Sequence, residues 1–175
     1  MNLKENRPLA WILVIVAMLA SVMISGSISL SAQRRAVINT FYDTMDDDLN
    51  TKSSYADNLA GIASRYIAQN SEYIMNMTQA RDLLAKASTP KEKYMASLSI
   101  TNAASAIYDL LGTKDLTQTD DRLRRSNYAD ILAVDDILKR SGFNEKVDSF
   151  NDELEMFPAN LISSLTNVEK AENFR

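Results

Sequence analysis

The acidic side chains are the groups in this 175-residue sequence that offer the most chemistry. Asp43, Asp46 and Asp47 stand at positions i, i+3 and i+4, so one face of a helix would present all three. Carboxylate oxygens are the ligands that Ca²⁺ and Mg²⁺ prefer, and Asp135 with Asp136 forms a second acidic pair. The simpler interpretation is a solvated acidic face. We therefore expect no metal site and no cofactor.

A small basic cluster is the second group of interest. Arg122, Arg124 and Arg125 follow directly after Asp120 and Asp121. Such a cluster would suit a phosphate or an anionic partner surface. The alternative, which we favour, is an exposed and charged first turn of a helix.

The sequence contains no His and no Cys. The first absence removes the commonest general base and metal ligand, and the second removes thiolate catalysis and Cys-ligated metals. The four glycines are isolated, so no glycine-rich phosphate-binding loop is encoded. The formal net charge of -4 argues against nucleic-acid binding. We predict that the protein is not an enzyme; a carboxylate-dependent hydrolase is the enzymatic alternative.

The elements that would position these groups are helices. Four Gly and three Pro leave little material for the tight turns that strands need. The breakers divide the sequence into three long helical segments, at about 34–87, 90–112 and 117–157. The connection between the last two is short, which predicts antiparallel neighbours. The predicted fold class is all-α, with an N-terminal transmembrane helix followed by an antiparallel bundle of long helices.

The first of these segments carries an apolar pattern with a seven-residue period, typical of a helix face close to a coiled-coil seam. Asn70 falls inside this stripe, where a lone Asn usually fixes the register of packing. We expect a structural role for Asn70. The two rows of the pattern are Leu59, Tyr66, Tyr73 and Ala80, and Ile62 or Ala63, Asn70, Met77 and Leu84.

Local signals mark the ends of the other segments. Thr89 followed by Pro90 and Glu92 predicts a capping box with Pro in the first helical position. The third segment begins at Thr117 or Thr119. Gly142 predicts a bend within it, and Pro158 ends or kinks it. The last 17 residues are expected to form a short helix or a frayed tail.

Residues 8–33 contain no charged side chain, and their core at 9–24 is almost entirely apolar. A membrane span needs roughly 20 such residues. A cleaved secretory signal is one interpretation. We favour an uncleaved anchor, because the apolar stretch exceeds an ordinary signal core and no Ala-x-Ala site follows it. Trp11 lies near one end, as interfacial aromatic residues do.

The predicted organisation is therefore a short head at 1–7, a transmembrane anchor at 8–33, a helical bundle at 34–165 and a tail at 166–175. Lys4 and Arg7 precede the anchor, whereas Arg34 and Arg35 follow it. We expect a single-pass protein of the cell membrane, with its amino terminus inside and the bundle outside the cytoplasm.

Paired motifs recur near the C-terminus. Phe143-Asn144 and Phe150-Asn151 are followed by Phe157-Pro158-Ala159-Asn160-Leu161. Upstream stand Asn58-Leu59 and Ala80-Arg81. In order and spacing these motifs resemble the LemA family, over about residues 34–165. The resemblance implies a membrane-anchored antiparallel helical bundle with no agreed enzymatic activity.

The sequence departs from the family pattern at two places within the bundle. Tyr55-Ala56-Asp57-Asn58 replaces the family's Ile-Pro-Asn, so the helix is expected to continue without a kink there. Leu110-Leu111-Gly112 stands near the position of a missing Tyr-Pro-x-Leu-Lys-x-Asn loop. The usual Gly-Phe tail is absent as well.

The C-terminal motif supplies the candidate interaction or structural residues Phe150, Phe157, Pro158 and Asn160. Phe150 and Phe157 share one helix face with Leu154, and we expect this face to pack against the first long helix around 59–66. The opposing interpretation is that 157–162 form an exposed docking motif for a partner.

The functional prediction is a non-enzymatic scaffold or interaction module at the cell envelope. The alternative is an accessory or binding subunit of an envelope enzyme complex, such as a membrane protease. The expected partners are the lipid bilayer, a protein of unknown identity and, as a further option, a second copy of the chain; nucleic acid is not expected.

Overall fold

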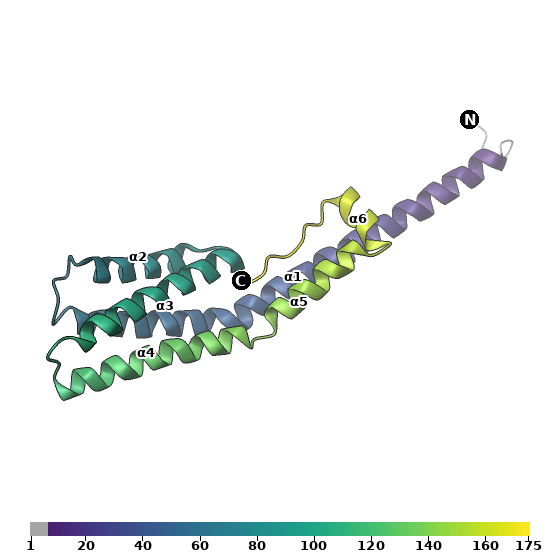
Figure 1. Cartoon of the computed structure of the whole chain (residues 1–175). Helices are drawn as coiled ribbons and strands as arrows, with labels where there is room; N and C mark the ends of the chain where they lie inside the picture. The colour runs from purple at the N-terminus through teal and green to yellow at the C-terminus, as the bar shows by residue number, and fades with distance from the viewer. Residues whose placement is uncertain (1–6) are drawn as a thin grey trace. The chain divides into compact units, whose positions relative to one another are not determined.

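The computed structural model describes residues 7–175, and every regular element in that range is helical. The all-α prediction is therefore confirmed. Figure 1 shows the order of the six helices along the described chain. Their bounds are α1 Arg7–Ala63, α2 Glu72–Lys86, α3 Pro90–Gly112, α4 Gln118–Lys139, α5 Phe143–Glu155 and α6 Ala159–Thr166.

The chain divides into two compact units. The N-terminal unit comprises Met1–Ile38 and Val147–Ala171, and the bundle unit comprises Asn39–Lys146 and Glu172–Arg175. The long helix α1 contributes residues to both units, and so does α5.

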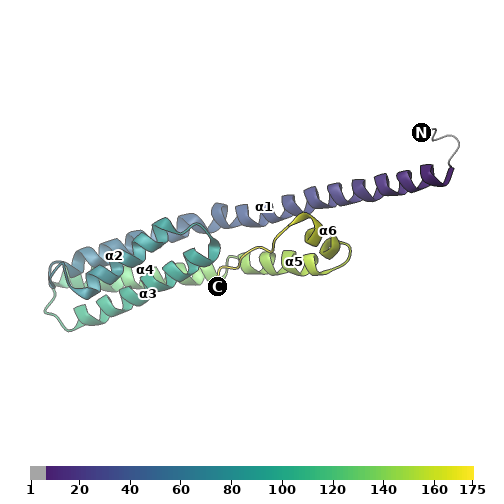
Figure 2. The ribbon, with the colours of Figure 1, turned by 90° about the horizontal axis from the view of Figure 1, so that it is seen from above.

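In the bundle unit, the C-terminal part of α1 lies beside α2, α3 and α4 (Figure 2). Successive helices run in opposite directions, as the short connections predict. The core consists of apolar side chains that recur every three or four residues and form a stripe on each helix. Its largest fully buried members include Phe41, Met45, Leu49, Leu59, Met77, Ile100, Ile107, Leu111, Ile131 and Phe143.

The predicted N-cap at Thr89 is confirmed, and of the two predicted starts of the third segment, Thr117 and Thr119, Thr117 is the N-cap. At the start of α3 the backbone N–H of Glu92 donates to Thr89 Oγ1 at 3.3 Å, and the backbone N–H of Thr89 donates to Glu92 Oε2 at 3.2 Å. At the start of α4 the backbone N–H of Asp120 donates to Thr117 Oγ1 at 3.1 Å. Each cap satisfies backbone N–H groups that have no partner within the helix.

The prediction of one helix over 34–87 is wrong, because the chain turns at residues 64–71 between α1 and α2. Tertiary hydrogen bonds hold this turn. Tyr66 Oη donates to Asp120 Oδ2 at 2.6 Å and accepts from the backbone N–H of Thr117 at 3.2 Å. The seven-residue pattern persists because α1 and α2 each bury an apolar stripe. Asn70 lies exposed in the turn, so the prediction that it fixes a helix register is also wrong.

The bend predicted at Gly142 is a complete break. Helix α4 ends at Lys139, and Gly142 takes a left-handed backbone conformation with a φ of 71° before α5 begins. Glycine adopts that conformation at little cost, because it has no Cβ atom. Helix α5 ends at Glu155, just before the Phe157–Pro158 step, and α6 follows.

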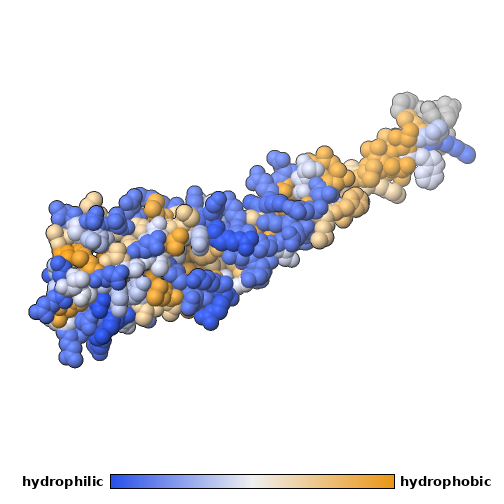
Figure 3. All heavy atoms as spheres, viewed as in Figure 1, coloured by the Kyte–Doolittle hydropathy of each residue, from blue (hydrophilic) through white to orange (hydrophobic). Residues whose placement is uncertain are grey.

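The N-terminal unit contains the first part of α1 with α5 and α6. Helix α1 is long and apolar enough to cross a membrane: its most apolar 18-residue window has a mean hydropathy of 2.4, and none of that window is buried. Figure 3 shows this apolar surface along the N-terminal part of the helix. Residues 1–6, which include most of the predicted head and Lys4, lie outside the described residues.

Candidate functional site

A buried lysine forms the centre of a polar cluster in the bundle unit. Lys52 lies on the buried face of α1 and is fully enclosed. Its Nζ donates to the carbonyl oxygen of Ser97 at 2.8 Å, to Ser97 Oγ at 2.7 Å and to a carboxylate oxygen of Asp135. Thr101 Oγ1 donates to the other carboxylate oxygen of Asp135 at 2.7 Å. Helices α1, α3 and α4 are thus joined through one ammonium group.

The electrostatics of Lys52 determine what this cluster can do. Burial lowers the pKa of Lys52, and the hydrogen bond and charge of Asp135 oppose that shift. The ammonium has three protons, and three acceptors are placed to receive them. A general base must be neutral, whereas this geometry is complementary to the charged form. The pairing of Ser97 with Lys52 is therefore suited to joining helices rather than to activating the hydroxyl.

A pocket of about 550 Å³ lies beside the cluster, within the bundle unit. Ser97, Thr101 and Asp135 contribute polar groups to its wall, and Tyr94 and Phe174 contribute rings. The pocket gives Asp135 access to solvent on one side, whereas Lys52 stays buried behind it. This arrangement explains how one half of the ion pair remains hydrated.

Two asparagines of α5 hold the C-terminal tail, each within its own unit. Asn144 Oδ1 accepts from the backbone N–H of Phe174 at 2.8 Å, and Asn144 Nδ2 donates to the Phe174 carbonyl at 3.0 Å. Asn151 makes the same pair of bonds with Ala171, at 2.9 and 3.0 Å.

We call these two pairs of hydrogen bonds the asparagine clamps, and they explain the recurring aromatic–Asn motif. In each pair the aromatic residue, Phe143 or Phe150, is buried in the core, and the following Asn faces the tail. The ring of Phe174 packs against Phe41 and Tyr94, with centroid distances of 5.6 and 5.4 Å. The expectation of a frayed tail does not apply to these residues.

The C-terminal candidates fall into two groups. Phe150 is buried, with 4% of its surface exposed, and Leu154 is buried as well. Both residues belong to the N-terminal unit, whereas residues 59–66, against which they were expected to pack, belong to the bundle unit. Phe157 is 81% exposed, so its expected packing is wrong. Pro158 and Asn160 are also exposed. The physical reason is that the chain leaves α5 after Glu155, which removes Phe157 from the helix face of Phe150.

Members of the acidic and basic clusters noted in the sequence form ion pairs. Asp46 pairs with Lys93, and Asp135 with Lys52. Within residues 7–175, no three acidic side chains converge on a potential metal position. The expectation of an exposed basic turn is wrong for Arg124, which is buried: its guanidinium lies 4.2 Å from the Tyr108 ring centroid and pairs with Asp121.

Comparison with known proteins agrees with the motifs of the C-terminal region. The model of the LemA family matches residues 42–175. The chain belongs to the LemA family. No curated protein matches this LemA-family chain. The match covers α2 to α6, the two asparagine clamps and Lys52.

The Lys52 cluster is the feature that sequence reasoning missed. Lys52 interrupts an apolar stripe that runs through Met45, Leu49, Ala56 and Leu59 at spacings of three and four. A single charged residue inside such a stripe is the available signal. Its partner Asp135 stands 83 positions away, so the spacing of residues along the chain does not reveal the pair.

Proposed function

We propose that this LemA-family protein is a single-pass, membrane-anchored helical bundle that acts as a non-enzymatic scaffold or interaction module at the cell envelope. The observation that carries the proposal is the exposed apolar part of α1, which continues as one helix into residues that form the bundle core. An apolar stretch exposed on every side is stable in a bilayer and costly in water.

Two further observations support a non-enzymatic role. The polar groups of the Lys52 cluster are engaged with one another across three helices. The LemA family is not a known enzyme family. A hydrolase that depends on carboxylates would need convergent acidic groups and a bound substrate in a common pocket.

The first experiment tests anchoring. Membranes from cells that express the full chain are washed with high salt and then at alkaline pH. We expect the protein to remain with the lipid. Replacing Leu13 and Val16 with Lys should release it, because charges at the centre of a span are strongly unfavourable. Release of a shortened wild-type chain would instead establish a cleaved signal and overturn the anchor.

Orientation can be tested because the sequence lacks cysteine. A Lys114→Cys variant places one thiol in the exposed connection between α3 and α4. We propose that the bundle lies outside the cytoplasm, so a membrane-impermeant maleimide should label this thiol in intact cells. Labelling that requires lysis would reverse the orientation.

The identity of the binding partner distinguishes the leading proposal from the alternative. The alternative is an accessory subunit of an envelope enzyme complex such as a membrane protease. Leu83 of α2 and Met95 of α3 are exposed apolar side chains in the wall of a pocket of about 740 Å³. A photo-crosslinking residue at position 83 should give one discrete adduct in intact cells. An adduct with an enzyme in fixed stoichiometry favours the accessory role, and an adduct at dimer mass identifies a second copy.

A further inference from the structure

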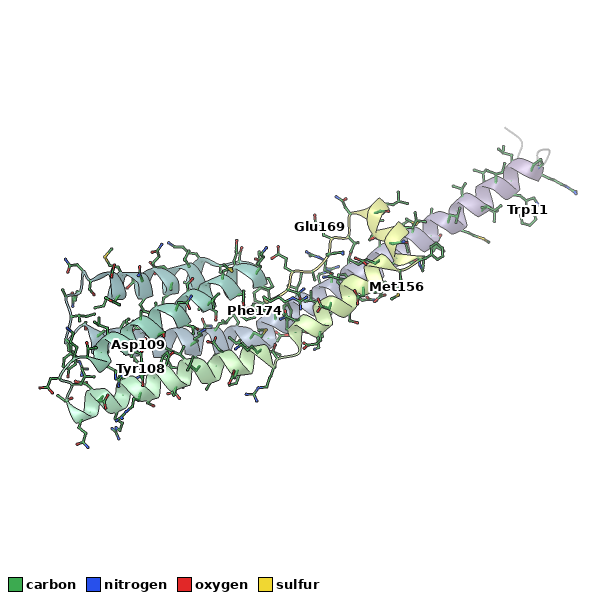
Figure 4. The ribbon with its side chains drawn as sticks, in the orientation of Figure 1. Trp11, Tyr108, Asp109, Met156, Glu169 and Phe174 are labelled. Carbon is green, nitrogen blue, oxygen red and sulfur yellow. The ribbon has the colours of Figure 1, made fainter. Side chains whose placement is uncertain are left out.

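The corner between α5 and α6 exposes an unusual amount of apolar surface. Met156, Phe157, Leu161 and Leu165 are all exposed in the N-terminal unit. They lie in a stretch, residues 156–168, that contains no charged side chain between Glu155 and Glu169. Figure 4 shows Met156 and Glu169 on either side of α6. Large exposed apolar groups concentrated in one segment mark a contact surface.

The contact between α6 and α1 locates this corner along the apolar helix. A Cβ atom added at Gly26 would lie 2.5 Å from Cδ1 of Ile162, so α6 packs directly on α1 at that glycine. Gly26 stands between the exposed residues Ile24 and Ile28. A hydrocarbon core takes roughly 20 helical residues, so a span that starts at Leu9 extends to about residue 28. Helix α6 therefore lies at the depth of the span's C-terminal edge.

The uncharged stretch of α1 and the uncharged stretch at 156–168 are bounded by charged residues that lie close to one another. Arg34 Nε, just beyond the uncharged stretch of α1, donates to the carbonyl oxygen of Glu169 at 3.0 Å. Lys170 pairs with Glu155 at 2.5 Å. The two uncharged stretches thus end together, as two segments that face the same apolar layer would.

The hydroxyl groups of α6 are satisfied within the helix. Ser163 and Ser164 donate to the carbonyl oxygens of Asn160 and Leu161, at 3.1 and 2.9 Å. Thr166 donates to the carbonyl oxygen of Ile162 at 2.7 Å. Such internal bonds lower the cost of placing hydroxyl groups near lipid.

From these observations we infer that the α5–α6 corner inserts into the bilayer interface as a second membrane contact beside α1, with Phe157 and Leu165 among the residues that meet lipid. The inference rests on the proposed membrane anchoring. Its occupant is the lipid bilayer, because the corner is packed on the segment that is itself suited to lipid. Together the two contacts would restrict the tilt of the N-terminal unit at the membrane surface.

Fluorescence of single tryptophans in vesicles tests the inference on the full chain. Trp11 is the only tryptophan in the sequence, so the wild-type protein reports on the anchor itself. A W11F/F157W variant reports on the corner. The matched control is W11F/M95W, because Met95 is an exposed apolar residue of the bundle unit that lies beside Lys91 and Glu92. The vesicles contain phosphatidylcholine brominated near the headgroup end of its acyl chains.

We expect the indole at position 157 to lose most of its fluorescence in brominated vesicles and to emit at shorter wavelength than in detergent-free buffer. The indole at position 95 should keep its intensity. Quenching of Trp11 without quenching at position 157 would overturn the inference and leave the anchor in place. Failure to quench Trp11 would overturn the anchor. A blue shift at position 157 that grows with protein density, without quenching by bromine, would assign the corner to contact between two copies.

Discussion

Asn144 and Phe174 are joined by two hydrogen bonds through a single side-chain amide, which pairs with both backbone groups of the phenylalanine. The contact spans 30 positions of sequence and closes the Phe174 ring over Phe41 and Tyr94. An amide is the side chain suited to this position, because it presents one donor and one acceptor at the spacing of a backbone N–H and C=O.

Replacing Asn144 with Asp should therefore destabilise the tail. The carboxylate keeps an acceptor but loses the donor for the Phe174 carbonyl, at an expected cost of about 1–3 kcal/mol. Hydrogen exchange at the Phe174 amide should accelerate in detergent-solubilised full-length protein. Asn102→Asp, at an exposed position of α3, is the control and should leave that amide unchanged. Equal exchange in both variants would contradict the clamp.

The two phenylalanines of the C-terminal motif should respond in opposite ways to truncation. Phe150→Ala should cost about 3–5 kcal/mol of unfolding free energy, since it leaves a cavity in a buried position. Phe157→Ala should change the unfolding free energy of the detergent-solubilised chain by less than about 1 kcal/mol, because exposed substitutions have small effects. A large loss with Phe157→Ala would place its ring in the core.

Removal of one partner of the buried ion pair should be more harmful than removal of both. Asp135→Leu leaves the fully buried Lys52 without its counter-charge and should cost about 3–5 kcal/mol. The double variant K52M/D135L should recover much of that loss, since apolar pairs often replace buried ion pairs at little cost. Chemical denaturation of the two variants provides the measurement. Additive losses in the double variant would show that the two side chains act independently.

The capping box of α3 gives a direct test of helix initiation. Thr89→Ala removes the acceptor for the Glu92 backbone N–H and should destabilise the bundle by about 1 kcal/mol. Thr89→Ser keeps the acceptor and serves as the control. An unchanged melting temperature in the alanine variant would mean that α3 begins elsewhere.

The same capping box predicts a pH dependence. Hydrogen bonds from the backbone and hydroxyl of Ser88 and from the backbone of Thr89 lower the pKa of Glu92 below its ordinary value of 4.5. A carboxyl whose pKa is lower in the folded state adds stability above the unfolded-state pKa and loses it as pH falls through the folded-state pKa. The stability difference between wild type and Glu92→Gln should therefore shrink on acidification. A difference that stays constant across that range would contradict the assigned bonds.

Several features of this protein follow from sequence because their causes are local. The capping box involves residues within three positions of one another, and the uncharged stretch at 8–33 is continuous. The apolar stripe that buries Leu49 and Leu59 repeats along one helix. In each case the relevant physical interaction is between neighbours in the chain, so spacing alone predicts it.

Tertiary structure decided the features that depend on distant partners. The stripe through Asn70 predicts a helix equally well on both sides of residues 64–71, and the bonds of Tyr66 with Asp120 and Thr117 select the turn. Phe157 shares the helical spacing of Phe150, yet the end of α5 at Glu155 leaves it exposed. A buried charge such as Lys52 is tolerated only where folding supplies its acceptors, and those acceptors lie on other helices. Periodicity describes which face of a helix is apolar, whereas only packing determines what that face meets.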